Sequence, residues 1–399
     1  IEIVPFPKYI FSNINMNNSI QVKNCRVCGH KFFEEPLLRY ENMPKAAQCL
    51  PDAGSLKNDK GIDLDLCQCS GCGLVQLSGP PVSYYREVIR ASAVSEEMKN
   101  FRKKQFKAFV NQYALKNKKI IEIGCGRGEF LSIMQTVAAE SYGLEYSPES
   151  VSQCINNGLK VFPGFVENND YKIKNSPFDA FFILNFLEHL PEPNSTLRGI
   201  YNNLNNEGIG LIEVPNFDMI LQKKLFSEFI SDHLFYFTKD TLNFTLEMNG
   251  FETIDCKIQW YDYIISAIVR KKKKTDLSDF QNDRLKLKQE IENYLSNFEN
   301  KKVAIWGASH QALAILSLLD LSNKIEYVID SAVFKQDKFT PATHIPIVAP
   351  EKLHSEPVDA VIVMAAGYSD EVARIIRQKF DKKINISILR DFGLEIIKS

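Results

Sequence analysis

Apolar residues fall into short continuous runs that alternate with amphipathic stretches through the middle of the chain. Such runs, bounded by glycine, proline and asparagine, predict buried strands, and the stretches between them predict helices. The expected strands are 119–123, 141–145, 159–162, 178–184, 208–214, 251–258 and 261–270. The expected helices include 96–115 and 239–249, the second with Thr238 as N-cap and Gly250 just beyond its end. The alternation predicts an α/β fold with a largely parallel sheet covered by helices on both faces.

The last two strands of this series break the parallel pattern. Only Gln259 and Trp260 separate them, which is enough for a hairpin and too short for a crossover connection. The final strand should therefore run antiparallel to its neighbours.

A second alternation follows a long charged segment. Residues 276–298 predict an amphipathic helix, and further elements are expected at 302–306, 310–319, 325–329, 359–363 and 370–380. A chain of 399 residues is too long for one ordinary core. We expect an N-terminal tail with a metal-binding module over 1–83, a core domain over 84–272, a linker helix over 273–300 and a C-terminal Rossmann-like α/β domain over 301–399.

The first expected strand runs directly into a glycine-rich turn and a helix. The glycines stand at alternate positions, Gly124, Gly126 and Gly128. Glycine lets the backbone turn sharply and approach a ligand closely, and the helix N-terminus beyond offers free N–H groups. Glu145 ends the next strand, where an acid fits the hydroxyls of a ribose. The G-x-G-x-G spacing, with Glu122 two residues before the first glycine, resembles motif I of class I S-adenosylmethionine (SAM) methyltransferases.

Ligands of doubly wound sheets lie beyond the carboxyl ends of the parallel strands. Segments that follow those ends should therefore face the cofactor. The expected cofactor-binding residues are Glu122, Gly124, Gly126, Gly128, Phe130, Glu145, Tyr146, Phe165, Asn185 and Phe186. For Phe165, packing in the core is an equally good interpretation.

Two C-x-x-C-G segments, called knuckles below, lie near the N-terminus. Their cysteines are Cys25, Cys28, Cys69 and Cys72. Four thiolates suit a tetrahedral Zn²⁺ site, and with no open coordination position the zinc would be structural. A disulfide scaffold is the alternative, but clustered cysteines in an odd total of nine favour metal binding in a reducing cytoplasm. We expect Cys49 and Cys67 to be free thiols.

Of the six histidines, only His189 and His233 fall in the core domain. Both follow strands at the expected active edge, and Asp232 precedes His233. An imidazole is a suitable base near neutral pH. We therefore expect His233, His189 and Asp232 to be the catalytic groups, with loop histidines of no catalytic role as the alternative.

Charge and hydropathy exclude several classes of protein. The net charge is −1, so neither nucleic acid nor an anionic membrane is an expected partner. The basic run 270–274 is local and fits a solvated strand end. No apolar run reaches the length of a membrane span, and the N-terminus lacks the features of a signal peptide. A cytoplasmic protein is expected.

Several segments together resemble the three-domain sugar C-methyltransferases of deoxysugar biosynthesis. These are the knuckle ending at 72–77, Leu-Glu-His at 187–189, acid-His-Leu-x-Tyr-Phe at 232–237, and the C-terminal segments 303–309, 327–330 and 344–347. The resemblance covers nearly the whole chain from about residue 22. It implies a SAM-dependent methyltransferase acting on a nucleotide-linked keto-deoxysugar, as a monomer or weak homo-oligomer.

The resemblance also implies residue roles. His233 takes the position of the base that removes a proton beside a sugar ketone, Asp232 replaces a glutamate and His189 matches a second histidine. The implied substrate-binding residues are Tyr84, Tyr85, Asn216 and Tyr236. The C-terminal domain would close the cleft and hold the nucleotide end of the substrate.

Two departures from the family pattern leave the reaction open. Ile230 stands where the family has a tyrosine, and only Ser83-Tyr84-Tyr85-Arg86-Glu87 remains of the tyrosine-rich stretch that joins the metal-binding module to the core. Both departures remove phenol groups expected in the pocket. Methylation of oxygen or nitrogen on a sugar or other small metabolite is therefore the enzymatic alternative. A nucleic-acid-binding module and a degenerate methyltransferase serving as an interaction platform are the alternatives of other classes.

Overall fold

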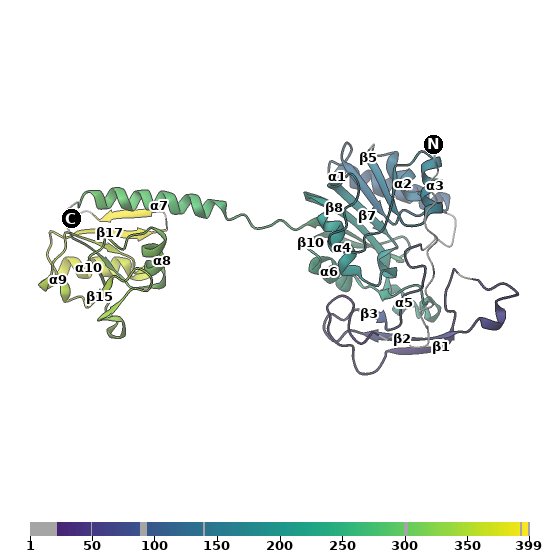
Figure 1. Ribbon diagram of the computed structural model, residues 1–399, viewed down its shortest axis with the longest axis horizontal. Coiled ribbons are helices and arrows are strands. Elements are labelled where there is room, and N and C mark those ends of the chain that lie inside the picture. The colour runs from purple at the N-terminus through teal and green to yellow at the C-terminus, as the bar shows by residue number, and fades with distance from the viewer. Residues whose placement is uncertain are drawn as a thin grey trace, which may run out of the picture. The chain divides into compact units, whose positions relative to one another are not determined.

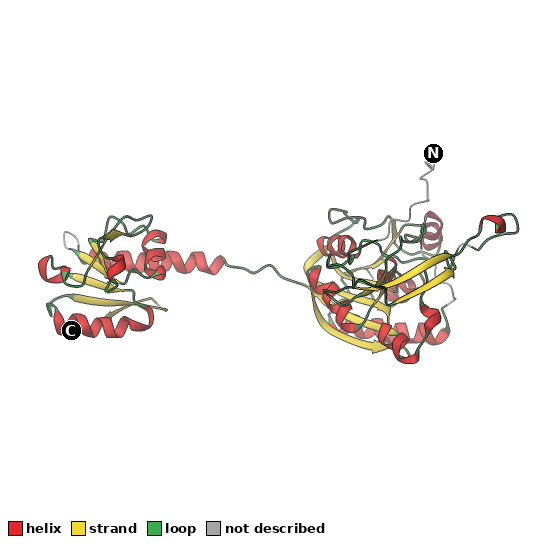
Figure 2. Ribbon diagram, turned by 90° about the horizontal axis from the view of Figure 1, so that it is seen from below, coloured by secondary structure: helices red, strands yellow, loops and turns green. Residues whose placement is uncertain are grey.

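The computed structural model describes residues 22–48, 50–87, 94–138, 140–298, 302–391 and 393–397. Residues 1–21, in the predicted N-terminal tail and metal-binding module, and Cys49 lie outside the described residues. The chain forms two compact units, Ile1–Lys273 and Lys274–Ser399 (Figure 1). In both, strands alternate with helices along the chain (Figure 2).

A sheet of seven strands forms the centre of the first unit. From one edge to the other the strands are β10 (Phe251–Gln259), β11 (Ile264–Lys271), β8 (Leu204–Pro215), β7 (Phe178–Leu184), β4 (Lys119–Ile123), β5 (Glu140–Glu145) and β6 (Val161–Pro163). Strands β4 to β8 pair in parallel, and β11 runs antiparallel to both of its neighbours. The predicted parallel sheet with an antiparallel last strand is confirmed.

Helices cover both faces of this sheet. They are α1 (Glu96–Gln112), α2 (Glu129–Gln135), α3 (Pro148–Asn156), α4 (Pro193–Asn202) and α6 (Lys239–Met248). Helix α5 (Phe217–Lys223) packs instead against strands of the N-terminal module. Both faces of the sheet are apolar and need to be covered. In strand β7, for example, the consecutive residues Phe181 and Phe182 are both fully buried, in separate clusters on opposite faces. The predicted cap of α6 is present: Thr238 accepts a hydrogen bond from Thr241 N–H, and Gly250 has φ +91°.

The N-terminal module pairs with the core through a second, antiparallel sheet. Its strands are β1 (Leu38–Met43), β2 (Ile62–Gln68), β3 (Val75–Leu77) and β9 (Phe235–Tyr236). Strand β9 belongs to the core segment just after His233, and Val75 pairs with Tyr236. The module is thus hydrogen-bonded directly to a segment expected at the active site.

Some predicted boundaries are wrong for local backbone reasons. Strand β11 begins at Ile264 rather than at 261, because Trp260, Tyr261 and Asp262 have φ of +50°, +56° and +65° and form the turn. Helix α1 ends at Gln112 rather than at 115, and Ala114 has φ +53° just beyond it.

The second unit contains another seven-stranded sheet. Its strands, in spatial order, are β14 (Lys338–Phe339), β15 (Pro346–Val348), β13 (Tyr327–Ile329), β12 (Val303–Trp306), β16 (Ala360–Val363), β17 (Asn385–Arg390) and β18 (Gly393–Ile397). The two edge strands are antiparallel and the other five are parallel. The helices are α7 (Ser278–Ser296), α8 (His310–Leu318), α9 (Lys352–Ser355) and α10 (Ser369–Lys379). Helix α7, predicted as a linker, buries Ile291, Tyr294 and Leu295 in the core of this unit.

Candidate active site

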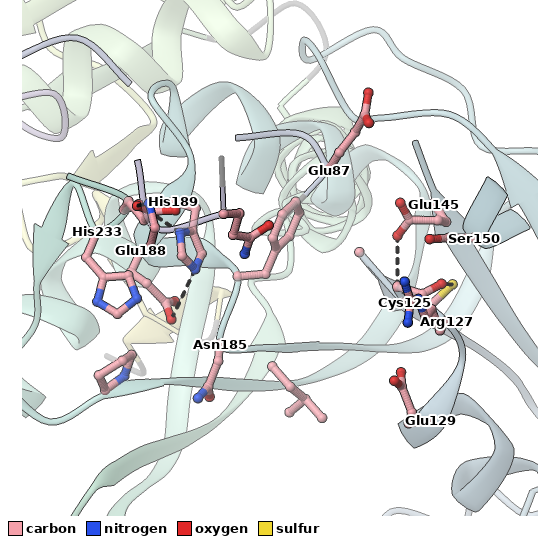
Figure 3. Close-up of a pocket in the computed structure, with 18 of the residues that line it drawn as sticks. Glu87, Cys125, Arg127, Glu129, Glu145, Ser150, Asn185, Glu188, His189 and His233 are labelled. Atoms are coloured by element: carbon pink, nitrogen blue, oxygen red, sulfur yellow. Dashed lines mark hydrogen bonds and ion pairs between the residues drawn. The ribbon is translucent and has the colours of Figure 1, made fainter. Parts of the chain in front are cut away.

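A cavity of about 260 Å³ opens at the carboxyl ends of the parallel strands of the first unit (Figure 3). Its wall combines the glycine turn after β4, Glu145 at the end of β5, and the segment after β7. The loop containing Asp232 and His233 adds another side, and Ala47 of the N-terminal module completes the lining. The cavity lies where doubly wound sheets bind ligands.

The glycine turn is built from left-handed backbone. Gly124, Gly126 and Gly128 have φ of +72°, +54° and +82°, a region that side chains disfavour. A Cβ on Gly124 would lie 2.6 Å from the Phe186 ring, whereas one on Gly126 would meet nothing within 4 Å. The backbone at Gly126 is therefore open to a ligand.

Glu145 fastens this turn to the next strand. Its carboxylate accepts hydrogen bonds from Gly126 N–H at 2.8 Å and from Ser147 N–H at 2.9 Å. Burial raises the pKa of Glu145 above its usual value, while these two hydrogen bonds oppose the shift. Each oxygen keeps further capacity to accept, so the carboxylate can also bind hydroxyl groups of a ligand.

The expected cofactor residues fall into two groups. Those that line the cavity are Glu122, Gly124, Gly126, Glu145, Asn185 and Phe186. The remaining four lie in other environments. Gly128 ends the turn against Leu159 and Cys154, and Phe130 is buried in the core cluster under α1.

Tyr146 and Phe165 surround an arginine that no sequence pattern singled out. The Arg86 guanidinium lies 5.4 Å from the Tyr146 ring centroid and 5.3 Å from that of Phe165. Phe165 contacts Phe186 edge-on, with centroids 6.4 Å apart, so this aromatic group continues to the cavity wall. The predicted cofactor role of both residues stays a prediction.

Two histidines lie together at the opposite end of the cavity from Glu145 (Figure 3). The ring centroids of His189 and His233 are 4.8 Å apart at an angle of 71°. His189 Nδ1–H donates to the Asp232 carbonyl oxygen at 2.7 Å, so Nε2 of the neutral ring carries the lone pair. Burial lowers the pKa of His189, and burial with the neighbouring His189 lowers the pKa of His233 to about 3.

The side chain of Asp232 points toward the N-terminal module. It accepts hydrogen bonds from the Tyr84 hydroxyl at 2.6 Å and from Ala47 N–H at 3.0 Å. Burial and the hydrogen bond to Asp232 raise the pKa of Tyr84 to about 12. The three predicted catalytic residues are therefore adjacent, with Asp232 orienting His189 through its carbonyl group.

The other expected substrate residues take part in local structure. The Asn216 side chain caps α5 by accepting from Asp218 N–H and donates to the Asp262 carbonyl. The Tyr236 hydroxyl accepts from Ile230 N–H at 3.1 Å, and the Tyr85 hydroxyl accepts from Arg86 at 3.0 Å. None of these three side chains is part of the cavity lining among the described residues.

Glu188 lines the cavity, although the sequence predicted no individual role for it. It lies on the short 3₁₀ helix η2 (Leu187–His189), and its side chain is fully buried at the cavity. Burial raises its pKa to about 8. Its Oε1 lies 3.9 Å from His189 Nε2, and its Oε2 has no hydrogen-bond partner among the described residues. The only signal in the sequence is an acid next to a histidine after a buried strand.

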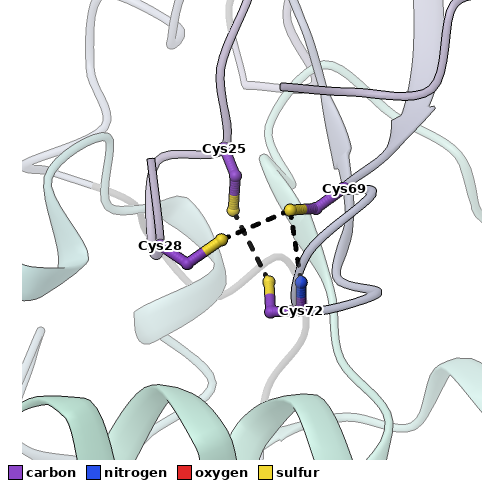
Figure 4. A group of neighbouring side chains, drawn as sticks. All are labelled: Cys25, Cys28, Cys69 and Cys72. Atoms are coloured by element: carbon purple, nitrogen blue, oxygen red, sulfur yellow. Dashed lines mark hydrogen bonds between the residues drawn. The ribbon is translucent and has the colours of Figure 1, made fainter. Parts of the chain in front are cut away.

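The four knuckle cysteines converge in the N-terminal module (Figure 4). The Sγ atoms of Cys25 and Cys72 are 3.7 Å apart, and those of Cys28 and Cys69 are 3.3 Å apart. Zinc–sulfur bonds of about 2.3 Å in a tetrahedron place sulfur atoms about 3.8 Å apart, so the cluster fits Zn²⁺ closely. Gln76 Nε2 also donates to Cys25 Sγ at 3.1 Å. Cys67 lies on β2 outside this group.

No helix among the described ranges is both long enough and apolar enough to cross a membrane.

Two family models match the chain. Residues 95–255 match a model described as a methyltransferase domain, and residues 269–386 match the C-methyltransferase C-terminal domain. A curated relative, the C-methyltransferase NovU from Streptomyces niveus, is 21% identical over 388 residues, covering 88% of this chain and 91% of that protein.

Among solved structures, the PH0226 protein from Pyrococcus horikoshii OT3 matches part of the chain. Its TM-score is 0.39 and its identity 14%, and the match covers 47% of this chain and 98% of that one. Another is a SAM-dependent methyltransferase from Clostridium acetobutylicum ATCC 824, with a TM-score of 0.36 and 12% identity, covering 47% of this chain and 96% of that one. The chain is a methyltransferase that combines a methyltransferase domain over 95–255 with a C-methyltransferase C-terminal domain over 269–386.

Proposed function

We propose that the chain transfers a methyl group from SAM to a carbon atom of a nucleotide-linked keto-deoxysugar, with His233 as the base. SAM supplies an electrophilic methyl group on a sulfonium. A carbon beside a ketone becomes a nucleophile when it loses its proton, and a well-placed imidazole accelerates that loss by about 10²- to 10⁴-fold.

One observation carries this proposal. The glycine turn with Glu145 and the histidine pair line the same cavity, at opposite ends. A methyl donor held at the first end and an acceptor held at the second would meet inside it. Positioning of two reactants supplies a large part of the rate of such a transfer.

The residues around His233 fix the position of its ring. The imidazole lies against His189, whose own orientation is fixed by its hydrogen bond to the Asp232 carbonyl. Tyr84 and Ala47 hold the Asp232 carboxylate in turn. In the proposed reaction His233 removes the proton and the surrounding groups keep its ring in place.

We also infer that the cysteine cluster holds one structural Zn²⁺. Its Sγ spacing and the N–H···S hydrogen bonds around Cys25 and Cys69 support this inference. The zinc would fold the two knuckles together and take no part in methyl transfer.

The test uses candidate nucleotide-linked keto sugars, with product analysis by mass spectrometry. Wild-type enzyme is expected to methylate carbon and to exchange the acidic C–H with deuterium from D₂O. His233→Ala should lower turnover and exchange at least about tenfold while SAM affinity, measured by calorimetry, persists. His310→Ala, a histidine of the second unit, is the matched control.

Two outcomes would contradict the proposal. Wild-type rates in His233→Ala would remove the base assignment. Methylation of oxygen or nitrogen without C–H exchange would establish the alternative reaction instead.

A further inference from the structure

We propose that Glu188, His189 and His233 form a second metal site, for a divalent transition metal ion such as Zn²⁺ or Co²⁺, inside the cavity. The site is distinct from the cysteine cluster and differs from it in ligand type. It lies at the end of the cavity that faces away from the glycine turn (Figure 3).

The geometry places three ligand atoms around one point. One side-chain atom from each residue lies within 4.8 Å of the other two. His189 Nε2 and Glu188 Oε1 are 3.9 Å apart. Ligands about 2.0–2.2 Å from a metal stand about 3.3 Å from each other in a tetrahedron, so closure around an ion needs side-chain shifts of well under 2 Å.

Glu188 gives a second, independent observation. Its side chain is fully buried at the cavity wall, and Oε2 has no hydrogen-bond partner among the described residues. A buried carboxylate oxygen without a partner carries a desolvation penalty. A bound cation would supply the missing partner.

His189 is oriented as metal-binding histidines are. Ligating imidazoles almost always donate their second ring N–H to a carbonyl or carboxylate, which fixes the tautomer and frees the other nitrogen. His189 Nδ1–H donates to the Asp232 carbonyl at 2.7 Å, and Nε2 faces Glu188. The hydrogen bond thus presents the nitrogen lone pair to the proposed ion.

The ligand set indicates the kind of metal. Two imidazoles and one carboxylate suit Zn²⁺ and neighbouring transition metals better than Mg²⁺ or Ca²⁺, which prefer oxygen ligands. Three protein ligands leave at least one coordination position, and it faces the cavity. A ketone or hydroxyl oxygen of a small molecule could take that position.

Metal binding and base function compete for the same residue. An imidazole nitrogen that binds a metal has no lone pair left to accept a proton, so the metal-loaded protein should be inactive. This consequence depends on the proposed role of His233, whereas the binding of the metal does not.

Cobalt binding to the full chain tests the site without any substrate. The cysteine cluster is first filled with one equivalent of Zn²⁺ per chain, which four thiolates bind in preference to an imidazole and carboxylate site. Added Co²⁺ should then bind once more per chain, with ligand-field bands of nitrogen and oxygen coordination and without the intense thiolate-to-cobalt charge-transfer band. X-ray absorption of the wild-type complex should show imidazole and oxygen neighbours and no sulfur.

Substitutions identify the ligands. Glu188→Gln, His189→Gln and His233→Gln should each weaken Co²⁺ binding at least about tenfold. Glu149→Gln and His310→Gln, at exposed positions, are the matched controls and should bind Co²⁺ like the wild type. Calorimetric SAM binding reports whether each variant is folded.

Two results would overturn the proposal: no Co²⁺ bound beyond the cysteine cluster, or sulfur in the coordination shell of the added ion. Unchanged affinity in folded Glu188→Gln and His233→Gln would do the same. If those variants do not fold, the absorption spectrum of the wild type alone decides.

Discussion

At the scale of single residues, Glu145 links the proposed cofactor-binding end of the cavity to the stability of the fold. The Glu145→Gln substitution places an amide where a carboxylate accepts from two backbone N–H groups. One of these donors would face an NH₂ group and remain unsatisfied, at a cost of about 1–3 kcal/mol in the free energy of unfolding. SAM affinity should fall about tenfold or more, because a charged acceptor for the ribose hydroxyls is lost.

Calorimetric titration with SAM and urea unfolding measure the two effects. Glu149→Gln removes an exposed carboxylate four residues further along the chain and should change neither quantity. Unaltered SAM affinity in Glu145→Gln would show that this carboxylate serves only to hold the turn.

Residue positions were predictable from the sequence where strand ends determine them. His189, His233 and Glu145 follow or end parallel strands, and the carboxyl ends of parallel strands meet at one edge of a sheet. Directions of side chains were not predictable in the same way. Asn216 lies near that edge, but its amide is used in capping α5, and Glu188 is turned inward by its short 3₁₀ helix.

At the scale of elements, a buried ion pair joins helix α1 to strand β8. Arg102 donates to Glu213, and the side chains are 1% and 0% exposed. Gln105 on the same helix also donates to Glu213. Removing one member of a buried pair leaves an uncompensated charge, which typically costs about 3–5 kcal/mol. Arg102→Met should therefore lower the free energy of unfolding by about that amount.

Urea unfolding measures this loss. The double variant Arg102→Met with Glu213→Leu should recover most of it, because both charges are then gone. Lys99→Met, which removes an exposed ion pair with Glu96 on the same helix, should cost less than about 1 kcal/mol. A loss in Arg102→Met as small as that in Lys99→Met would mean that the pair does not hold the helix.

Long buried strands were predictable at this scale, and short ones were not. Strands β4 and β7 have the predicted bounds, because each is an apolar run closed by glycine or asparagine. Strands β3 and β9 have only three and two residues, too few for a periodic pattern. Their pairing depends on the knuckles and on the loop at His233, which no local pattern reveals.

At the scale of the whole molecule, the two compact units contain separate hydrophobic cores. We expect two transitions in differential scanning calorimetry, one for each unit. Replacing a zinc ligand by Cys25→Ser should lower the midpoint of one transition by several degrees and leave the other unchanged, because a structural metal stabilises only the unit that binds it.

Zinc content by mass spectrometry accompanies that measurement. About one tightly bound zinc per chain is expected after dialysis, and it should be lost in Cys25→Ser. The control is Cys256→Ser, which changes a cysteine of β10 outside the cluster and should retain the metal. A wild-type chain that is folded and free of zinc would contradict the assignment.

The pairing of β3 with β9 ties the cysteine module to the chemistry of the core. Leu77 N–H donates to the Leu234 carbonyl, and Leu234 N–H donates to the Glu188 carbonyl. Backbone hydrogen bonds therefore connect the strand after the second knuckle with Leu234 and Glu188, which are the sequence neighbours of His233 and His189. Ala47 and Tyr84 extend this connection to Asp232. A chain trimmed to its nucleotide-binding fold would keep the proposed SAM-binding turn and lose Ala47 and Tyr84, which hold Asp232 beside the proposed base. A shortened catalyst would therefore have to retain the N-terminal module.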